Sequence, residues 1–413
     1  MKLTQPNYPI IEDTLTTGAV AREVVEAAHG DIRDRPVGTG PYRLKEWKRG
    51  SRVILEANPG YRPIRFPASS DPSQAGLERS MQGKTLPQIG VVELSVIEES
   101  VTRLLEFDRG RLDCVTLRGE VASRLLADGR VKPEYAARGI ARHVFPEPYL
   151  FAIYFNMQDP VIGGMGNDRI ALRRAIAQAY DLHRLVEVVY AGQAIVANQL
   201  VPPRAGGHDP DLAPKARHDP ATANALLDRY GYDKRDRDGY RMAPGGKPLT
   251  LSMTLASGAI SREVQTLWKR DMDVIGVRFE FREIPYQDYI KQLEAGKFQL
   301  YSGGYGGTVS GYAELIELYS PEPPTVNSTR FKLPQYDEAM EQYLRSPTDA
   351  GQIAAARKMN EMARTYMPIF PTIFRLQNDF AQPWVQGFSP PVFQSYWKYL
   401  DIDLEKRRKA GIN

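Results

Sequence analysis

Residues 249–301 read LTLSMTLASGAISREVQTLWKRDMDVIGVRFEFREIPYQDYIKQLEAGKFQLY. Apolar strand-like runs alternate here with segments whose apolar residues have helical spacing; the runs are 249–255, 277–281 and 298–301, and the helical segments are 261–275 and 285–295. Gly276 and Gly296 follow the two helical segments, as is common at helix ends. This order predicts a parallel or mixed sheet covered by helices, which is an α/β fold.

Segments before this stretch extend the same pattern. Tyr42–Trp47 and Ser51–Ala57 are strand-like runs joined by a short glycine-containing turn, which predicts a β-hairpin. Asn167 or Asp168 is predicted to cap one long helix that continues to Val189. Helices and strands therefore alternate over most of the chain.

Two further apolar runs predict strands far apart in the sequence. Tyr149–Phe155 is a dense aromatic run that is typical of a buried strand. Ile369–Phe374 is also apolar, but Pro371 lies inside it and cannot donate a ladder hydrogen bond. We therefore expect this second strand to be an edge strand or a hinge-like strand and not a central one.

Composition excludes several classes of function. The chain has 413 residues, and its 54 basic and 50 acidic side chains are well mixed, which argues against a nucleic-acid-binding surface. Cys114 is the sole cysteine, so an intrachain disulfide and a cysteine-rich metal site are excluded. Residues 1–18 lack the apolar core of a signal peptide, and no apolar run is long enough to span a membrane.

The usual signatures of catalysis and cofactor binding are also absent. The sequence contains no Gly-x-Ser-x-Gly elbow, no phosphate-binding loop and no dinucleotide-binding glycine motif that opens a helix. Its five histidines have no zinc-ligand spacing. We therefore expect no catalytic residues, no metal and no cofactor, and we expect that the protein is not an enzyme.

A set of short motifs gives the sequence a family resemblance. The motifs occur in the order Gly38-Thr-Gly-Pro-Tyr42, Asn58-Pro-Gly-Tyr61, Tyr154-Phe-Asn156, Ala171–Asp181, Val201-Pro-Pro203, Asp219-Pro220 and Asn327–Phe331. Each is weak alone, but their order over most of the chain resembles the family 5 extracellular solute-binding proteins, the oligopeptide, dipeptide and nickel binders of ABC importers.

The resemblance implies a two-lobed periplasmic-binding-protein-like fold of the type II, cluster C kind. Its first lobe would hold residues 1–149 and 376–413, and its second lobe residues 150–375. Only 37 residues precede Gly38, so we expect that the first lobe is incomplete and that the chain is N-terminally truncated. The full-length family member is expected to be periplasmic or otherwise extracytoplasmic.

The function implied by the resemblance is that of a substrate-binding component. A peptide-like or other small organic solute would bind in a cleft between the lobes, and the membrane subunits of an ABC transporter would be the protein partner. We expect a monomer. Two other functions stay open, which are a hydrolase that uses cleft carboxylates and a non-transport adaptor derived from a truncated paralogue.

Candidate ligand-binding residues come from two segments; they are Tyr149, Asn156, Tyr301, Tyr305, Gly306, Gly307 and Thr308. The first two belong to an aromatic strand that by default packs in a core, and the others to a glycine-rich run that by default is a surface loop. Tyrosines interleaved with glycines would offer stacking surfaces beside accessible backbone amides, which suits a ligand pocket.

The glycine-rich run departs from the family at one place. Peptide binders carry a Trp-x-Ala-Asp-Tyr motif whose aspartate pairs with the ligand's α-amino group, whereas this chain has Tyr305-Gly-Gly-Thr-Val309. Since no acid stands there, we expect a ligand that has no free amine at this position, or a larger ligand.

Overall fold

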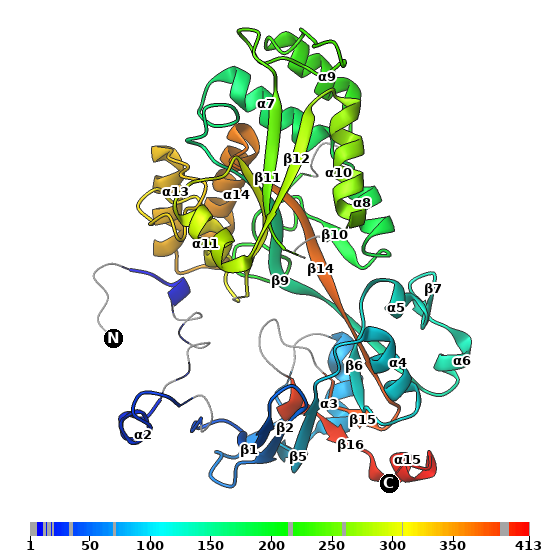
Figure 1. Ribbon diagram of the computed structural model, residues 1–413. Coiled ribbons are helices and arrows are strands. Elements are labelled where there is room, and N and C mark those ends of the chain that lie inside the picture. The colour runs from blue at the N-terminus through cyan, green and yellow to red at the C-terminus, as the bar shows by residue number, and fades with distance from the viewer. Residues whose placement is uncertain are drawn as a thin grey trace. The chain divides into compact units, whose positions relative to one another are not determined.

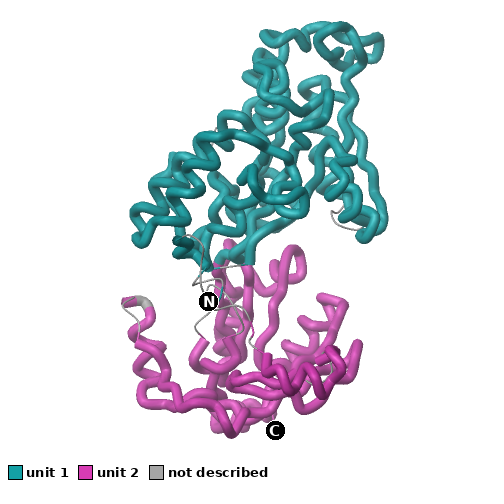
Figure 2. Tube along the Cα trace, turned by 90° about the vertical axis from the view of Figure 1, so that its left-hand side faces the viewer, with its two compact units in different colours: residues 1–14, 146–376 teal, residues 15–145, 377–413 magenta. Residues whose placement is uncertain are grey.

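The computed structural model describes residues 6–10, 14, 18, 20–32, 36–68, 72–213, 218–257, 262–307, 309–388 and 396–412. Figure 2 shows two compact units: unit 1 comprises residues 1–14 and 146–376, and unit 2 comprises residues 15–145 and 377–413. The lobes expected from the sequence divide at 149/150 and 375/376. That they are the bodies which close on a ligand stays a prediction.

Unit 1 is built around most of a seven-stranded mixed sheet in the order β10-β14-β9-β13-β11-β12. The strands are β9 (Ala141–Phe155), β10 (Ala194–Val196), β11 (Thr250–Ala256), β12 (Arg278–Ile284), β13 (Leu300–Gly306) and β14 (Ile369–Ala381). The helices are α7 (Asn167–Ala179), α8 (Leu182–Val188), α9 (Pro220–Arg229), α10 (Arg262–Val274), α11 (Tyr286–Glu294), α12 (Tyr312–Ile316), α13 (Pro334–Arg345) and α14 (Asp349–Tyr366).

The central stretch folds as its pattern predicts. β11 pairs in parallel with β12 over seven residue pairs, from Thr250↔Arg278 to Ala256↔Ile284. The chain then crosses back through α11, and β13 pairs in parallel with the other side of β11. In Figure 1, α10 and α11 lie on opposite sides of these strands. The α/β fold class predicted from the sequence is therefore confirmed.

Alternating residues of the sheet divide the interior of unit 1 into two cores. Ile153 and Phe155 pack with residues of α7, α8 and α10, whereas Leu150, Ala152 and Tyr154 pack with residues of α13 and α14. The two-residue period of a strand sends neighbouring side chains to opposite faces, so both faces of β9 are buried. This explains why the sequence of β9 reads as a continuous apolar run.

Two details differ from the sequence prediction. The long helix expected from Asn167 to Val189 is broken, because the carboxylate of Asp181 accepts a hydrogen bond from the backbone N–H of Arg184 and starts α8 as a new helix. β14 is not an edge strand either, since it lies between β10 and β9. Pro371 is tolerated beside β10 because pairing there involves only Ile373–Arg375.

Unit 2 carries smaller sheets and short helices. Its central sheet has the order β1-β2-β5, in which β1 and β2 form the predicted hairpin with a bulge between Leu44 and Glu46. The strands are β1 (Tyr42–Lys48), β2 (Arg52–Ala57), β3 (Ile64–Arg65), β4 (Thr85–Leu86), β5 (Val91–Ser95), β6 (Cys114–Thr116), β7 (Leu126–Ala127), β8 (Arg130–Val131), β15 (Val385–Gln386) and β16 (Asp401–Ile402).

The helices of unit 2 are all short. They are α2 (Arg22–Ala27), η1 (Pro72–Gln74), α3 (Ala75–Met81), α4 (Ser100–Asp108), α5 (Gly119–Ser123), α6 (Pro133–Ala136), η2 (Trp397–Tyr399) and α15 (Leu404–Lys409). Across the described ranges of both units, no helix has the length and apolar character needed to cross a bilayer.

The break between α7 and α8 gives a stability prediction. Asp181→Ala removes the N-cap of α8 and should lower the free energy of unfolding by about 1 kcal/mol, measured by urea denaturation. Glu187→Ala, on the exposed side of the same helix, is the matched control and should change it by less than about 0.5 kcal/mol. Equal effects of the two substitutions would contradict the capping role.

Candidate functional site

The pocket of unit 1 lies where the central sheet splits. β13 pairs with β11 through only Met253↔Leu300 and Thr254↔Tyr301, but with β9 through seven pairs from Leu300↔Phe155 to Gly306↔Tyr149. α10 follows the carboxyl end of β11. The two strands that pair in parallel with β11, which are β12 and β13, lie on opposite sides of β11. Such a switch point at the carboxyl ends of parallel strands is the usual place for a ligand crevice in open α/β sheets.

A cavity of about 850 Å³ occupies this place, and all of its walls belong to unit 1. Its walls are largely aromatic; the aromatic residues are Phe151, Tyr154, Tyr180, Tyr190, Trp268, Phe281, Tyr286, Tyr289, Tyr301 and Tyr305. The volume falls within the range of about 300–1,000 Å³ that is typical of small-molecule sites. The pocket therefore offers a wide apolar lining with separate polar groups.

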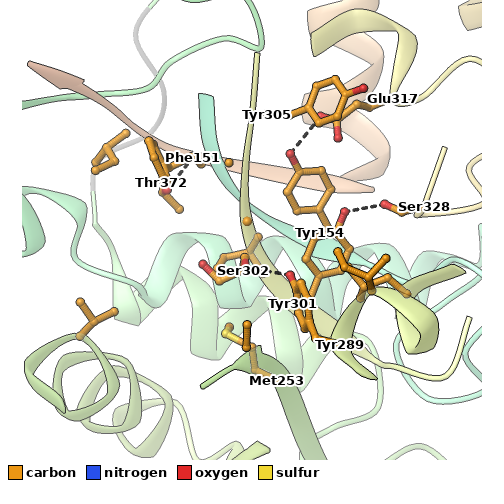
Figure 3. A pocket seen from close by; sticks show the side chains of 18 of the residues that line it. Phe151, Tyr154, Met253, Tyr289, Tyr301, Ser302, Tyr305, Glu317, Ser328 and Thr372 are labelled. Atoms are coloured by element: carbon orange, nitrogen blue, oxygen red, sulfur yellow. Dashed lines mark hydrogen bonds between the residues drawn. The ribbon is translucent and has the colours of Figure 1, made fainter. Parts of the chain in front are cut away.

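Two tyrosines from neighbouring strands form the centre of one wall. Tyr154 and Tyr301 face each other in the β9–β13 ladder, and their rings stack in parallel with centroids 4.4 Å apart. The Tyr301 hydroxyl shares a hydrogen bond of 2.5 Å with the Ser328 hydroxyl, and the Tyr289 hydroxyl donates to the Ser302 carbonyl at 3.2 Å (Figure 3). These bonds fix the rings and leave a rigid aromatic surface.

A buried acid stands beside this wall. Glu317 directly follows α12, and its Oε2 accepts a hydrogen bond of 2.9 Å from the Tyr154 hydroxyl (Figure 3). Burial raises the pKa of Glu317 well above its ordinary value, and burial likewise raises the pKa of Tyr154. Burial therefore favours the uncharged form of both groups.

The cation in the pocket wall is already neutralised. The guanidinium of Arg375 lies 2.8 Å from Glu147 Oε2 and 4.3 Å from the centroid of the Phe151 ring. The Thr372 hydroxyl donates to the Phe151 carbonyl at 2.7 Å and holds β14 against β9. Arg375 thus completes an ion pair and a cation–π contact within the protein.

Metal-binding side chains do not cluster among the residues that the structure describes. Within the described part of the chain, no three His, Cys, Asp or Glu side chains gather in a way that could hold a metal ion. The chemistry that the pocket offers is therefore stacking on aromatic rings and hydrogen bonding by hydroxyl and carboxyl groups.

Comparison with known proteins agrees with this geometry. Residues 1–323 match the model of the "Bacterial extracellular solute-binding proteins, family 5 Middle". The chain belongs to this family. Among curated relatives it is 21% identical to the dipeptide-binding protein of Escherichia coli K12, over 74% of this chain and 50% of that protein. It is 22% identical to di/tripeptide-binding protein 2 of Pseudomonas aeruginosa, over 94% of this chain and 66% of that protein.

Several solved structures share the fold of this chain. HbpA2 of Haemophilus parasuis matches with a TM-score of 0.70 at 18% identity, covering 97% of this chain and 72% of that chain. The oligopeptide-binding protein AppA of Bacillus subtilis, solved with a nonapeptide, matches with a TM-score of 0.71 at 14% identity, over 97% and 75%. The predicted periplasmic-binding-protein-like fold is thus confirmed.

The chain matches only part of the length of these relatives. The chain spans about half to two thirds of the length of the curated relatives named above. The expectation that the first lobe is incomplete stays a prediction.

Two of the ligand-binding residues predicted from the sequence lie in the pocket wall. Tyr301 and Tyr305 both line the pocket. Tyr149 is paired with Gly306, and 40% of its surface is exposed. Gly307 is folded so closely against Tyr149 that a Cβ there would lie 2.7 Å from the Tyr149 hydroxyl oxygen. These three residues border the wall strands but are not among the pocket-lining residues.

Two predicted residues have a different outcome. Thr308 lies outside the described residues. Asn156 does not line the pocket, because its amide nitrogen donates to the carbonyls of Gly296 and Phe298 at 2.9 Å each, and its Oδ1 accepts from the N–H of Gln158. In these contacts Asn156 ties the end of β9 to the turn before β13.

The sequence analysis missed several pocket residues. Trp268 and Tyr289 come from α10 and α11 and look like core residues of amphipathic helices. Glu317 had a visible signal, because it stands between Ile316 and Leu318 in an apolar segment. A carboxylate in such a segment is costly to bury, which marks it for attention.

The contacts of Asn156 predict a structural role. Asn156→Ala should lower the free energy of unfolding by about 2 kcal/mol, because one buried and one partly buried carbonyl lose their donor. Chemical denaturation measures this change, and Gln158→Ala, which keeps its backbone N–H, is the control. A substitution that leaves stability intact but removes ligand binding would instead support the original assignment of Asn156 to the site.

Proposed function

We propose that this chain provides the ligand-binding part of an ABC importer's substrate-binding protein and captures a peptide-like solute in the pocket of unit 1. The observation that carries this proposal is the aromatic cavity of about 850 Å³ at the carboxyl ends of β11 and β13. Membership of family 5, and relatives whose names state dipeptide and di/tripeptide binding, support the ligand class.

The pocket suits binding better than chemistry. The hydroxyls of Tyr301, Tyr289 and Tyr154 are held in hydrogen bonds to Ser328, Ser302 and Glu317, and burial favours the uncharged form of Glu317. Aromatic rings held rigidly give large contact area at low entropic cost, which favours affinity for a flexible solute. In this proposal the protein is not an enzyme and acts as a monomer outside the cytoplasm.

Such a carrier works by differential affinity. A ligand that binds one conformation more tightly shifts the population toward it, and the membrane subunits of the transporter would recognise the liganded conformation. One structure with the same fold is described as an ABC transporter-associated periplasmic binding protein, DppA of Helicobacter pylori with peptide STSA, at 17% identity and a TM-score of 0.70 over 97% of this chain and 71% of that chain. That description supports the same partner here.

The proposal predicts stabilisation by ligand without turnover. In a thermal-unfolding screen of di- and tripeptides, a ligand at about 100 times its Kd should stabilise the protein by about 2.7 kcal/mol. Mass spectrometry of the same mixtures should show the peptides unchanged. Hydrolysis of a bound peptide would instead favour the carboxylate-hydrolase alternative.

A variant that fills the pocket supplies the control. Ser257 directly follows β11, is exposed and lines the pocket, so Ser257→Trp should abolish the ligand-induced shift while the ligand-free melting temperature stays near that of the wild type. Ser80→Trp, on an exposed position of α3 in unit 2, should retain the full shift. A shift that survives in Ser257→Trp would place the ligand elsewhere.

A further inference from the structure

Glu317 is a buried acid with an unused hydrogen-bonding position. Only 3% of its surface is exposed, yet it lines the pocket. The Tyr154 hydroxyl donates to Oε2, and the residues that the structure describes form no further hydrogen bond or ion pair with this carboxyl group. Oε1 therefore has no partner in the described part of the protein, and it is not among the fully buried unpaired side-chain atoms there, so it is open to the pocket.

The groups that face Glu317 do not supply a positive charge. They are mainly phenols, and they come from three elements: Tyr154 of β9, Tyr301 and Tyr305 of β13, and Tyr336 of α13, and burial raises the pKa of each. Glu314 of α12 and Glu322 add negative charge around Tyr305. Burial raises the pKa of Tyr301, and the positive charge of Arg330 partly opposes this rise. The Arg330 guanidinium donates to the backbone carbonyls of Ser328 and Glu294, and it makes no ion pair with Glu317.

The protonation state follows from this environment. An ionised carboxylate that is buried without a cation is strongly unfavourable, and a buried acid takes up a proton instead. Burial accordingly raises the pKa of Glu317 well above its ordinary value. Because Oε2 accepts from Tyr154, the proton is placed on Oε1, which makes Oε1 a hydrogen-bond donor at the pocket.

We propose that Glu317 is a specificity-determining residue of the unit 1 pocket and that its Oε1–H donates a hydrogen bond to an oxygen atom of an uncharged ligand group, such as an amide carbonyl. The ligand class that follows is a solute whose buried end is a blocked or internal amide, and a free ammonium is disfavoured at this place. The ligand assignment rests on the proposed function of peptide-like solute binding, but the state of Glu317 is testable without any ligand.

The ligand-free test compares the wild type with Glu317→Gln. Glutamine keeps an oxygen acceptor for Tyr154 and an N–H donor in place of Oε1–H, so the variant should fold. In infrared difference spectra at pH 7, the wild type should show a protonated-carboxyl C=O band that the variant lacks. Absence of this band would overturn the proposal.

The stability of the same pair should diverge with pH. The pKa of Glu317 is higher in the folded state than the value of 4.5 that applies when it is exposed, so the folded protein binds the additional proton. As pH rises above 4.5, the unfolding free energy of the wild type should therefore fall relative to that of Glu317→Gln. Glu361→Gln, an exposed acid on α14 with the same change of charge, should show no such divergence from the wild type. Parallel curves for wild type and Glu317→Gln would overturn the proposal.

The ligand test uses trialanine amide, which carries one ammonium, and N-acetyl-trialanine amide, which carries none. Calorimetric titration at pH 7 should give at least about tenfold tighter binding of the acetylated peptide. Glu317→Gln should keep this affinity to within about threefold, because the amide N–H replaces the acid O–H, and Glu317→Leu should weaken it by about tenfold.

Two outcomes would contradict the ligand assignment in different ways. Tighter binding of the ammonium peptide, lost in Glu317→Gln, would show that Glu317 ionises and binds a cation, which overturns the proposal. Binding of neither peptide would overturn the proposed function together with this ligand class, and the infrared and pH measurements would still decide the state of Glu317 itself.

Discussion

The site depends on how β13 pairs with its two neighbours. It stays with β9 for seven residue pairs but leaves β11 after Tyr301, and the pocket occupies the opening. The glycines of β13 permit this course, since a Cβ at Gly304 would lie 2.9 Å from the Phe151 ring, and Gly306 has a φ of +129° that other residues rarely adopt. A strand with ordinary side chains could not approach the aromatic residues of β9 so closely.

The electrostatics of the pocket follow from the same packing. β9 supplies Phe151, on which the Arg375 guanidinium stacks while it pairs with Glu147, and Tyr154, which donates to Glu317. The positive group therefore has its counterion within the protein, and burial favours the uncharged form of Glu317. Beside Tyr154 and Tyr301, a ligand would meet hydrogen-bonding groups on aromatic surfaces.

Hydrophobic periodicity made most of the fold of unit 1 predictable. The central repeat of strands and helices was predictable from the spacing of its apolar residues and from the glycine that follows each helix. Tyr301 and Tyr305 could be proposed as site residues because they are interleaved with glycines. The break before α8 was harder to see, because the apolar spacing continues through Asp181 and only the N-cap bond to Arg184 reveals it. Asn156 was assigned to the site because it belongs to the aromatic segment that the family resemblance places at the cleft, whereas its bonds to backbone carbonyls are tertiary contacts that a sequence does not show.

Glu317 illustrates why the missing acid of the glycine-rich run was an incomplete guide to specificity. Sequence reasoning looked for a carboxylate at the aligned place and found Gly306 and Gly307, while the chain brings Glu317 to the pocket from beyond α12. Position alone would suggest that the acid has simply moved. Its surroundings favour a different role, because burial against Tyr154 without a cation disfavours the ionised carboxylate and favours the protonated acid. The same functional group thus favours opposite ligands, an ammonium when it is ionised and a carbonyl oxygen when it is neutral, and the environment decides between them.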